Sequence, residues 1–437
     1  MGRGTRLVLA VVCGVAVAGV YAGQPVLEPM GRDLGMPRES VGWFVAAGQL
    51  GYLAGLVLLV PLGDLLDRRR LIAAHLALVA AGLAIAATAP AAWVALCGLV
   101  VAGGFAVVVQ TAVAFAAAIS PPGERGRTLG VVTSGVVVGI LGARAVTGGL
   151  ADLWGWRSSY LVLAVLSAVL AVVALVALPT DLRVDRSRYG QVIRTLGGLF
   201  NNPIFLTRGL VAFFLFASFG TLWSGMALPL AAAPWQLSEA QIGLFGVAGL
   251  AGALGAARAG RWGDAGHTGR VTGIALVLLL GSWLAIGQLG WSLPLLVLGV
   301  VVLDFAVQAV HVGNQHVLTT AYPERTSSAI GGYMVFYSLG SAFGAAATTA
   351  LFDAFGWAGP TVLGALLALG ALVTAARGGR SAAGPTRRGS SRSRTRARRR
   401  AGSLGTKGFP PTRSGAAGEP AGSRCARGPG AAPSGPA

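Results

Sequence analysis

An acidic side chain lies inside a stretch of sequence that is otherwise apolar enough to cross a membrane. The stretch VVLDFAVQAVHVGNQHVL, residues 301–318, contains Asp304 near its start, and Gln308, His311 and Gln315 follow. At about 100° per residue, the three later side chains fall within about 40° of Asp304 around a helix. These four polar residues therefore form one stripe over three helical turns.

A charged side chain that faces lipid is unfavourable, so we expect the stripe to face the interior of a helix bundle. Burial favours the protonated form of a carboxylic acid, and a nearby cation favours the ionised form. We therefore expect Asp304 to load and release a proton, and His311 could relay it, because an unperturbed histidine titrates near neutral pH. Among Asp, Glu, Lys and Arg, the other residue in the interior of a predicted span is Arg144, which could be a partner of Asp304 or a substrate anchor. The alternative for this pair is a structural salt bridge.

Further polar side chains lie within predicted spans. Tyr21, Gln24 and Glu28 share one face of the first span. Gln24 could have a simpler role, because the next residue is proline and leaves backbone carbonyls without a donor. The Gln24 amide could donate hydrogen bonds to those carbonyls. Helix packing is likewise an alternative role for His311, and Asn314 and His316 lie off the stripe. The predicted substrate-binding residues are Arg144, Gln24, Tyr21, Gln110, Gln308 and Gln315, with Gln49 as a further polar candidate.

The composition predicts that all these residues sit in a membrane protein. Of 437 residues, 54% are hydrophobic and only 11% are charged, far from the balance of a soluble protein. About 20 mostly apolar residues suffice for one membrane-spanning helix. We find twelve such stretches: 7–27, 41–62, 71–91, 93–118, 129–150, 158–178, 208–229, 240–260, 271–290, 293–317, 329–351 and 359–376. The first could instead be a signal peptide, but the repeat described below requires it as a helix.

The charged residues predict the orientation of these spans. With the N-terminus in the cytoplasm, the outer loops hold three arginines and six acidic residues, whereas the N-terminus and the inner loops up to residue 328 hold sixteen arginines and seven acidic residues. This is the positive-inside pattern, and it places both termini in the cytoplasm. We therefore expect a multi-pass protein of the plasma membrane.

The chain also repeats itself with an offset of about 200 residues. PLGDLLDRRR, which ends at Arg70, corresponds to RWGDAGHTGR, which ends at Arg270, and DLWGW at 152–156 corresponds to DAFGW at 353–357. A duplicated six-helix unit gives two parallel halves around a central cavity. The predicted segments are 1–178, the N-terminal half; 179–207, a cytoplasmic linker; 208–376, the C-terminal half; and 377–437, a basic tail that cannot form a core.

Two parallel six-helix halves with acidic and basic loops resemble the major facilitator superfamily, over about residues 5–376. The loop GDLLDRRR is similar to that family's Gly-x-x-x-Asp-Arg motif, and GVVVGILGARAVTGG resembles its glycine-rich antiporter motif, although Arg144-Ala145 replaces the usual Gly-Pro. The chain looks most similar to a bacterial drug or sugar efflux branch. The resemblance implies gating roles for Gly63, Asp64, Asp67, Arg68, Arg70, Asp264 and Arg270. The alternative is that these residues lie in solvated loops, where exposed ion pairs contribute little. Family position also suggests cavity roles for Trp223, Tyr333, Phe336 and Tyr337, where ordinary packing is the simpler interpretation.

Three functions remain open at this point. The first is a secondary transporter that exports a small organic compound, drug-like or sugar-like, in exchange for protons. The second is a proton-coupled uptake symporter on the same scaffold, and the third is a membrane receptor that no longer transports. No nucleotide-binding loop, metal cluster or nucleophile–base pair is found in the sequence, so we expect no enzyme, cofactor or metal site. The expected partners are a small molecule, protons and the bilayer, with no nucleic acid, and the expected state is a monomer.

Overall fold

The first half of the chain folds into helices that follow its apolar stretches. The structure, a computed structural model, describes residues 2–121, 124–180, 190, 197–262, 268–322 and 326–383. Its first half contains α1 (Arg3–Tyr21), η1 (Gln24–Val26), α2 (Leu27–Asp33), η2 (Arg38–Ser40), α3 (Gly42–Leu58), η3 (Val60–Asp64), α4 (Arg68–Ala87), α5 (Ala92–Phe105), α6 (Val108–Ile119), α7 (Arg125–Trp154) and α8 (Trp156–Ala177).

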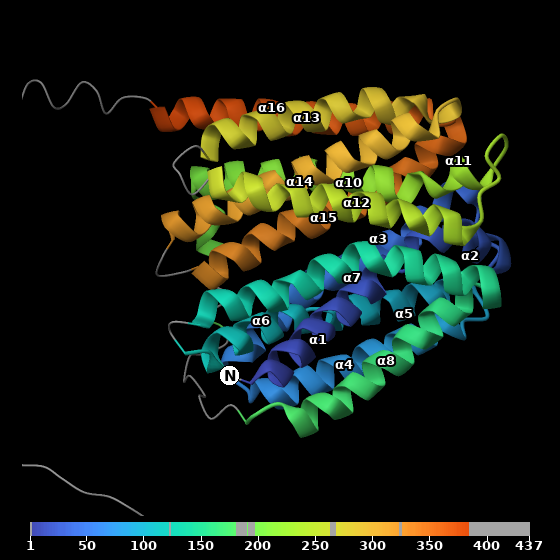
Figure 1. Ribbon diagram of the computed structural model, residues 1–437. Coiled ribbons are helices and arrows are strands. Elements are labelled where there is room, and N and C mark those ends of the chain that lie inside the picture. Colours follow the sequence, from blue (N-terminus) through green and yellow to red (C-terminus); the bar gives the residue numbers. More distant parts are fainter. Residues whose placement is uncertain are drawn as a thin grey trace, which may run out of the picture. The chain divides into compact units, whose positions relative to one another are not determined.

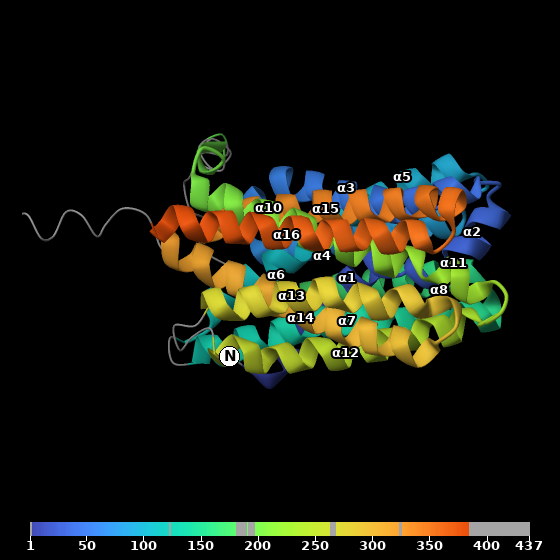
Figure 2. The same cartoon turned by 90° about the horizontal axis from the view of Figure 1, so that it is seen from above.

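The second half repeats this order. It contains α10 (Pro203–Gly225), α11 (Ala227–Ala231), α12 (Glu239–Trp262), α13 (Thr268–Ile286), η6 (Gly287–Gly290), α14 (Leu293–Ala321), α15 (Thr326–Phe355) and α16 (Ala358–Ala383). The long helices run side by side along one common direction (Figures 1 and 2). Figure 1 shows α4 and α8 on one side of the bundle and α13 and α16 on the other.

The prediction of an all-α membrane protein with two halves is confirmed. Among the described residues, 11 helical segments are long and apolar enough to cross a membrane. The remaining predicted span corresponds to α12. Asp264 lies outside the described residues, as does most of the predicted linker 179–207. The final helix, α16, continues to Ala383, beyond the predicted end of the last span at 376.

Two predicted spans are broken at equivalent places in the repeat. The first span divides after Tyr21, where α1 ends, and the seventh divides after Gly225, where α10 ends. A proline follows each break by four residues, Pro25 in one half and Pro229 in the other. Proline has no backbone N–H and cannot bond the carbonyl four residues earlier, so each helix ends there. The fourth span is also divided, between α5 and α6.

The repeated motifs DLWGW and DAFGW have a backbone reason. Each lies where a long helix ends and the last helix of its half begins. The glycines of the two motifs, Gly155 and Gly356, have φ angles of 80° and 58°. Side chains other than glycine rarely adopt this region, so glycine suits both junctions. We call the end of the bundle that carries these junctions the predicted outer end, following the charge pattern of the loops.

The two halves meet along two helix pairs, α7 with α12 and α3 with α15. Glycines bring the backbones together there. A methyl group added at Gly148 of α7 would overlap the Glu239 carbonyl oxygen of α12, and one added at Gly42 of α3 would overlap the Ala345 carbonyl oxygen of α15. Thr349 strengthens the second pair, because its hydroxyl donates to the Glu39 carbonyl oxygen at 2.9 Å. Each of these contacts lies toward the predicted outer end.

Three glycines of the fifth span, Gly135, Gly139 and Gly148, pack closely against neighbouring helices. Methyl groups added at Gly135 and Gly139 would overlap backbone atoms of Ala10 and Gly14 on α1. Gly148 faces α12 as described above. Gly149 differs from the other three, since an added methyl group would meet no described atom within 4 Å.

These contacts predict opposite outcomes for one substitution at two sites in the same helix. Gly139→Val should push α7 away from α1 and destabilise the N-terminal half by about 1–3 kcal/mol, as overpacking commonly does. Gly149→Val is the matched control and should stay within about 0.5 kcal/mol of the parent. Thermal unfolding of the detergent-solubilised proteins, followed by size-exclusion chromatography after heating, measures both. Equal loss of stability at the two positions would contradict the assignment of the seam to Gly139.

Candidate functional site

Arg144 lies on the side of α7 that faces the second half. Methyl groups added at Gly243 and Gly246 of α12 would overlap the Arg144 carbonyl oxygen or approach its Cβ atom. Its side chain is 1% exposed. The Nε atom donates to Oε1 of Gln24 at 2.7 Å, and Nη1 donates to the Ile140 carbonyl oxygen at 3.1 Å.

Aromatic rings surround the guanidinium group. Its central carbon lies 3.7 Å from the ring centroid of Trp223, and 5.5 and 5.6 Å from those of Tyr21 and Phe219. Cation–π attraction of this kind grows when water is excluded. The ion pairs formed within the described residues do not include Arg144. The rings and two hydrogen bonds thus offset the cost of burying this cation.

Asp304 is completely buried on α14, near the same tryptophan. Neither carboxyl oxygen has a hydrogen-bond partner among the described residues. The Trp223 indole N–H lies near the carboxyl group without meeting the geometry of a hydrogen bond. Gly249 of α12 makes room here, because a methyl group added to it would lie 2.9 Å from Oδ2. Asp304 is within electrostatic reach of Arg144, but the two form no direct salt bridge in this conformation.

A small pocket opens beside Arg144 toward the predicted outer end. It is narrow, with room for about one water-sized group (about 10 Å³). Both broken helices contribute to it, because it lies where α1 gives way to η1 and where α10 gives way to α11. The residues that line it are Gln24, Pro25, Arg144, Trp223, Met226, Ala227 and Ile242. Helix breaks of this kind commonly form the binding sites of membrane transporters.

His311 belongs to a second polar group, enclosed by helices of the C-terminal half. Its Nδ1 atom lies 2.9 Å from the Tyr333 hydroxyl, and its Nε2 atom lies 3.0 Å from Nε2 of Gln315. The Phe216 ring packs edge-on against it at 5.2 Å between centroids. If the Gln315 amide donates, then His311 is neutral and carries its proton on Nδ1. Gln308 is half-buried on the same helix.

The structure brings some of the predicted site residues together and leaves others apart. Tyr21 joins the Arg144 cluster, and its hydroxyl forms a hydrogen bond with the Tyr337 hydroxyl of the other half. Gln110, by contrast, donates to the Tyr52 hydroxyl at 2.7 Å, within the N-terminal half. Gln49 is fully buried near the Tyr21 hydroxyl, although its amide does not meet the geometry of a hydrogen bond with it.

Other residues at the site were not predicted, or were given a cavity role only by the family resemblance, with packing as the simpler alternative. Trp223 contacts Arg144, and Tyr337 bonds Tyr21 across the two halves. Asn314 was placed off the polar stripe, yet it is fully buried, and its Oδ1 accepts from Nη1 of Arg208 at 3.1 Å. The stripe was defined from Asp304, so it missed a polar residue that faces α10 instead. The signal available was Arg208, an arginine near the start of an apolar span.

The predicted gating loop before α4 also has a structural role. The Asp67 carboxylate accepts a hydrogen bond from the Arg69 backbone N–H at 3.0 Å, which makes Asp67 the N-cap of α4. Nε of Arg70 lies 3.8 Å from the same carboxylate. Gly63 approaches the Thr111 side chain, and Arg270 is exposed on α13. The loop therefore fixes the start of a helix, whether or not it also controls a gate.

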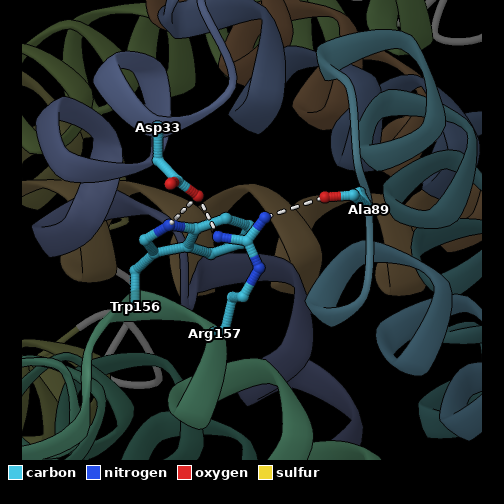
Figure 3. A network of polar contacts seen from close by, with 4 residues as sticks. All are labelled: Asp33, Ala89, Trp156 and Arg157. Atoms are coloured by element: carbon cyan, nitrogen blue, oxygen red, sulfur yellow. Dashed lines mark hydrogen bonds and ion pairs between the residues drawn. The ribbon is translucent and has the colours of Figure 1, made fainter.

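A polar network at the predicted outer end holds the N-terminal half together (Figure 3). Asp33 at the end of α2 accepts from the Trp156 indole at 3.1 Å and forms an ion pair with Arg157. The other Arg157 nitrogen, Nη2, donates to the Ala89 carbonyl oxygen at 2.9 Å. Three loops are thus joined through one carboxylate and one guanidinium group.

Comparisons with known proteins agree with this geometry. The chain is 40% identical over 364 residues to the uncharacterized transporter YgaY of Escherichia coli O157:H7, covering 83% of this chain and 92% of that protein. It is 33% identical over 388 residues to the probable transporter SCO4007 of Streptomyces coelicolor, covering 86% and 89%.

Solved structures show the same fold at low sequence identity. A bacterial homologue of the human lysosomal transporter Spinster, inward-facing and occupied, has a TM-score of 0.68 at 15% identity, covering 85% of this chain and 95% of its own. A mutant of the nucleoside transporter NupG has a TM-score of 0.65 at 13% identity, covering 86% and 98%. The Major Facilitator Superfamily model matches residues 9–230 and 209–415, which include both halves. With its two six-helix halves, its transporter relatives and these matches, the chain belongs to the Major Facilitator Superfamily of membrane transporters.

Proposed function

We propose that the protein exports a small organic compound across the plasma membrane in exchange for protons, acting as a monomer with both termini in the cytoplasm. Asp304 is the proton-binding group, and Arg144 anchors the substrate. The observation that carries the proposal is the carboxyl group of Asp304, fully buried without a hydrogen-bond partner among the described residues and within electrostatic reach of Arg144. Ionisable groups inside a membrane commonly serve transport.

The contacts between the halves support a cycle of alternating access. The glycine contacts of α7 with α12 and of α3 with α15 close the predicted outer end. Rocking of one half against the other would part these contacts and change the surroundings of Asp304. A carboxyl group that is neutral in one arrangement and ionised in the other binds and releases a proton once per cycle. An exporter results if the substrate and the proton cannot be bound together.

Uptake by proton symport is the second candidate, and one observation favours it. The pocket beside Arg144 presents hydrogen-bond donors, and a substrate that accepts hydrogen bonds would leave Asp304 free to hold a proton at the same time. Substrate and proton would then bind together. The sign of the effect of pH on substrate binding separates the two candidates, because competition weakens binding at low pH and co-binding strengthens it.

Substitutions at the two buried charges test the coupling role. Asp304→Asn should abolish transport driven by a pH gradient while still permitting energy-independent exchange, because the residue can no longer ionise. Arg144→Gln should weaken substrate binding and lower transport. Reconstituted vesicles with a pH-sensitive dye inside report proton movement when compounds that respond with the parent protein are added.

The double substitution distinguishes coupling from a structural salt bridge. If the two charges only neutralise each other, Asp304→Asn with Arg144→Gln leaves no unpaired charge and should restore proton-coupled transport. If Asp304 carries the proton, the double variant should remain uncoupled. Full coupling in the double variant would therefore refute the proposed role of Asp304.

The loop before α4 requires a pair of substitutions, because Asp67 also caps the helix. Asp67→Asn keeps a capping side chain and removes the charge, whereas Asp67→Ala removes both and should cost about 1 kcal/mol of stability. A gating role predicts slowed turnover with measurable substrate binding in both variants, and likewise in Arg68→Ala. Turnover and binding are measured in the same vesicles. Normal turnover of Asp67→Asn, with loss only in Asp67→Ala, would leave the loop with a capping role alone.

A further inference from the structure

The pocket beside Arg144 contains buried hydrogen-bond donors that lack acceptors. Nη2 of Arg144 and Nε2 of Gln24 have no partner among the described residues, and both side chains are at most 2% exposed. The Oε1 atom of Gln24 is already taken by Nε of Arg144. Neither free nitrogen can accept a hydrogen bond. The unsatisfied polar atoms that these two residues present to the pocket are therefore all donors.

A third donor lies between the pocket and Asp304. The Trp223 ring lines the pocket and stacks on Arg144, and its Nε1 atom has no geometric partner among the described residues. The remaining walls are apolar, from Pro25, Met226, Ala227 and Ile242. The space is narrow, with room for about one water-sized group (about 10 Å³), far less than the pockets of drug-sized ligands, so in this conformation it admits only one small polar end of a solute.

We infer that this pocket binds the carboxylate group of a small organic acid, with one oxygen on Nη2 of Arg144 and the other on the Gln24 amide. The inference rests on the proposed transport function in its second form, proton symport, and names the class of its substrate. Charge-assisted hydrogen bonds from a guanidinium group are the strongest available to a carboxylate, and the apolar walls suit a hydrocarbon body. The alternative is that buried water accepts the hydrogen bonds of these donors and no solute binds selectively. The experiment must exclude it.

Asp304 makes this binding dependent on pH. When ionised, it repels the bound carboxylate and attracts the same guanidinium group; when protonated, it does neither. Among the described residues, the other charged or titratable groups near this cluster include Arg144 of α7, Tyr21 of α1, Tyr52 of α3, Tyr337 of α15 and His311 on α14 itself. The tyrosines stay neutral over the physiological range. Carboxylate and proton should therefore bind together, as in the symport candidate.

Binding to the purified full-length protein in lipid nanodiscs tests the inference without any transport. The probes are benzoate, its neutral isostere benzamide and the cation benzylamine, each measured by calorimetry in mildly acidic and mildly alkaline buffer. Benzoate should bind, more tightly in the acidic buffer, and benzamide should bind at least ~10-fold more weakly because it lacks the charge. Equal binding of all three, preference for benzylamine, or no binding of benzoate up to its solubility would overturn the inference.

Three variants locate the effect. Arg144→Gln should weaken benzoate binding ~10- to 100-fold, whereas Arg3→Gln, which changes an exposed arginine of α1, should not. Asp304→Asn should keep tight binding and lose its dependence on pH, which a merely unfolded protein cannot do. If benzoate binding still depends on pH in Asp304→Asn but no longer does so in His311→Gln, the role of Asp304 is overturned.

The outcomes also separate this inference from the proposed function. Benzoate binding that follows these variants, in a protein that moves no protons in vesicles, would support the carboxylate site and refute proton-coupled transport. Proton-coupled transport of another compound, with no benzoate binding, would refute the carboxylate site and leave the transport function standing.

Discussion

The centre of this molecule is organised by a guanidinium group that must be kept inside the membrane without a carboxylate bonded to it. Arg144 meets this requirement with the face of Trp223, the amide of Gln24 and a carbonyl of its own helix. Each partner imposes a condition on the fold. The amide comes from the break in the first span, and the ring comes from the other half of the protein. The cation can be buried only while both halves and the break are in place.

The duplicated architecture repeats the helix break in both halves, but the charged residues differ between them. Pro25 and Pro229 end the first helix of each half at the same point, and both breaks border one pocket. The charges are not duplicated, since Arg144 lies in one half and Asp304 in the other. The repeat therefore sets the shape of the site, while divergence between the halves sets its chemistry. Glycines then let α12 approach Arg144 of α7, and Gly249 of α12 makes room for Asp304 of α14.

Much of this could be predicted from the sequence because the bilayer imposes simple rules. Twelve apolar stretches and a repeat with a constant offset were enough for the fold, and two isolated charges were enough to find the buried pair. The partners of those charges were harder to predict. Trp223 reads as an ordinary apolar residue, and its position over Arg144 depends on how α10 packs against α7. Asn314 was missed because helical angles measured from Asp304 describe only one face of α14.

Local signals could have improved other assignments. Aspartate directly before a helical run is a common N-cap, so the role of Asp67 was readable without any family resemblance. The helix breaks were also visible in part, since a proline inside an apolar span ends the helix about four residues earlier. What no local signal shows is the Tyr21–Tyr337 hydrogen bond, which joins residues from different halves.

The walls of the small pocket have a mechanical consequence. Gln24, Pro25 and Arg144 belong to the first half, whereas Trp223, Met226, Ala227 and Ile242 belong to the second. A cavity with walls on two bodies exists only while those bodies keep one relative position. A solute bound there contacts both halves, so it either holds them together or keeps them apart. Its release therefore requires the halves to move relative to each other. Occupancy of the pocket then depends on the relative position of the two halves. A solute too large or too small for the space would shift that position throughout the bundle.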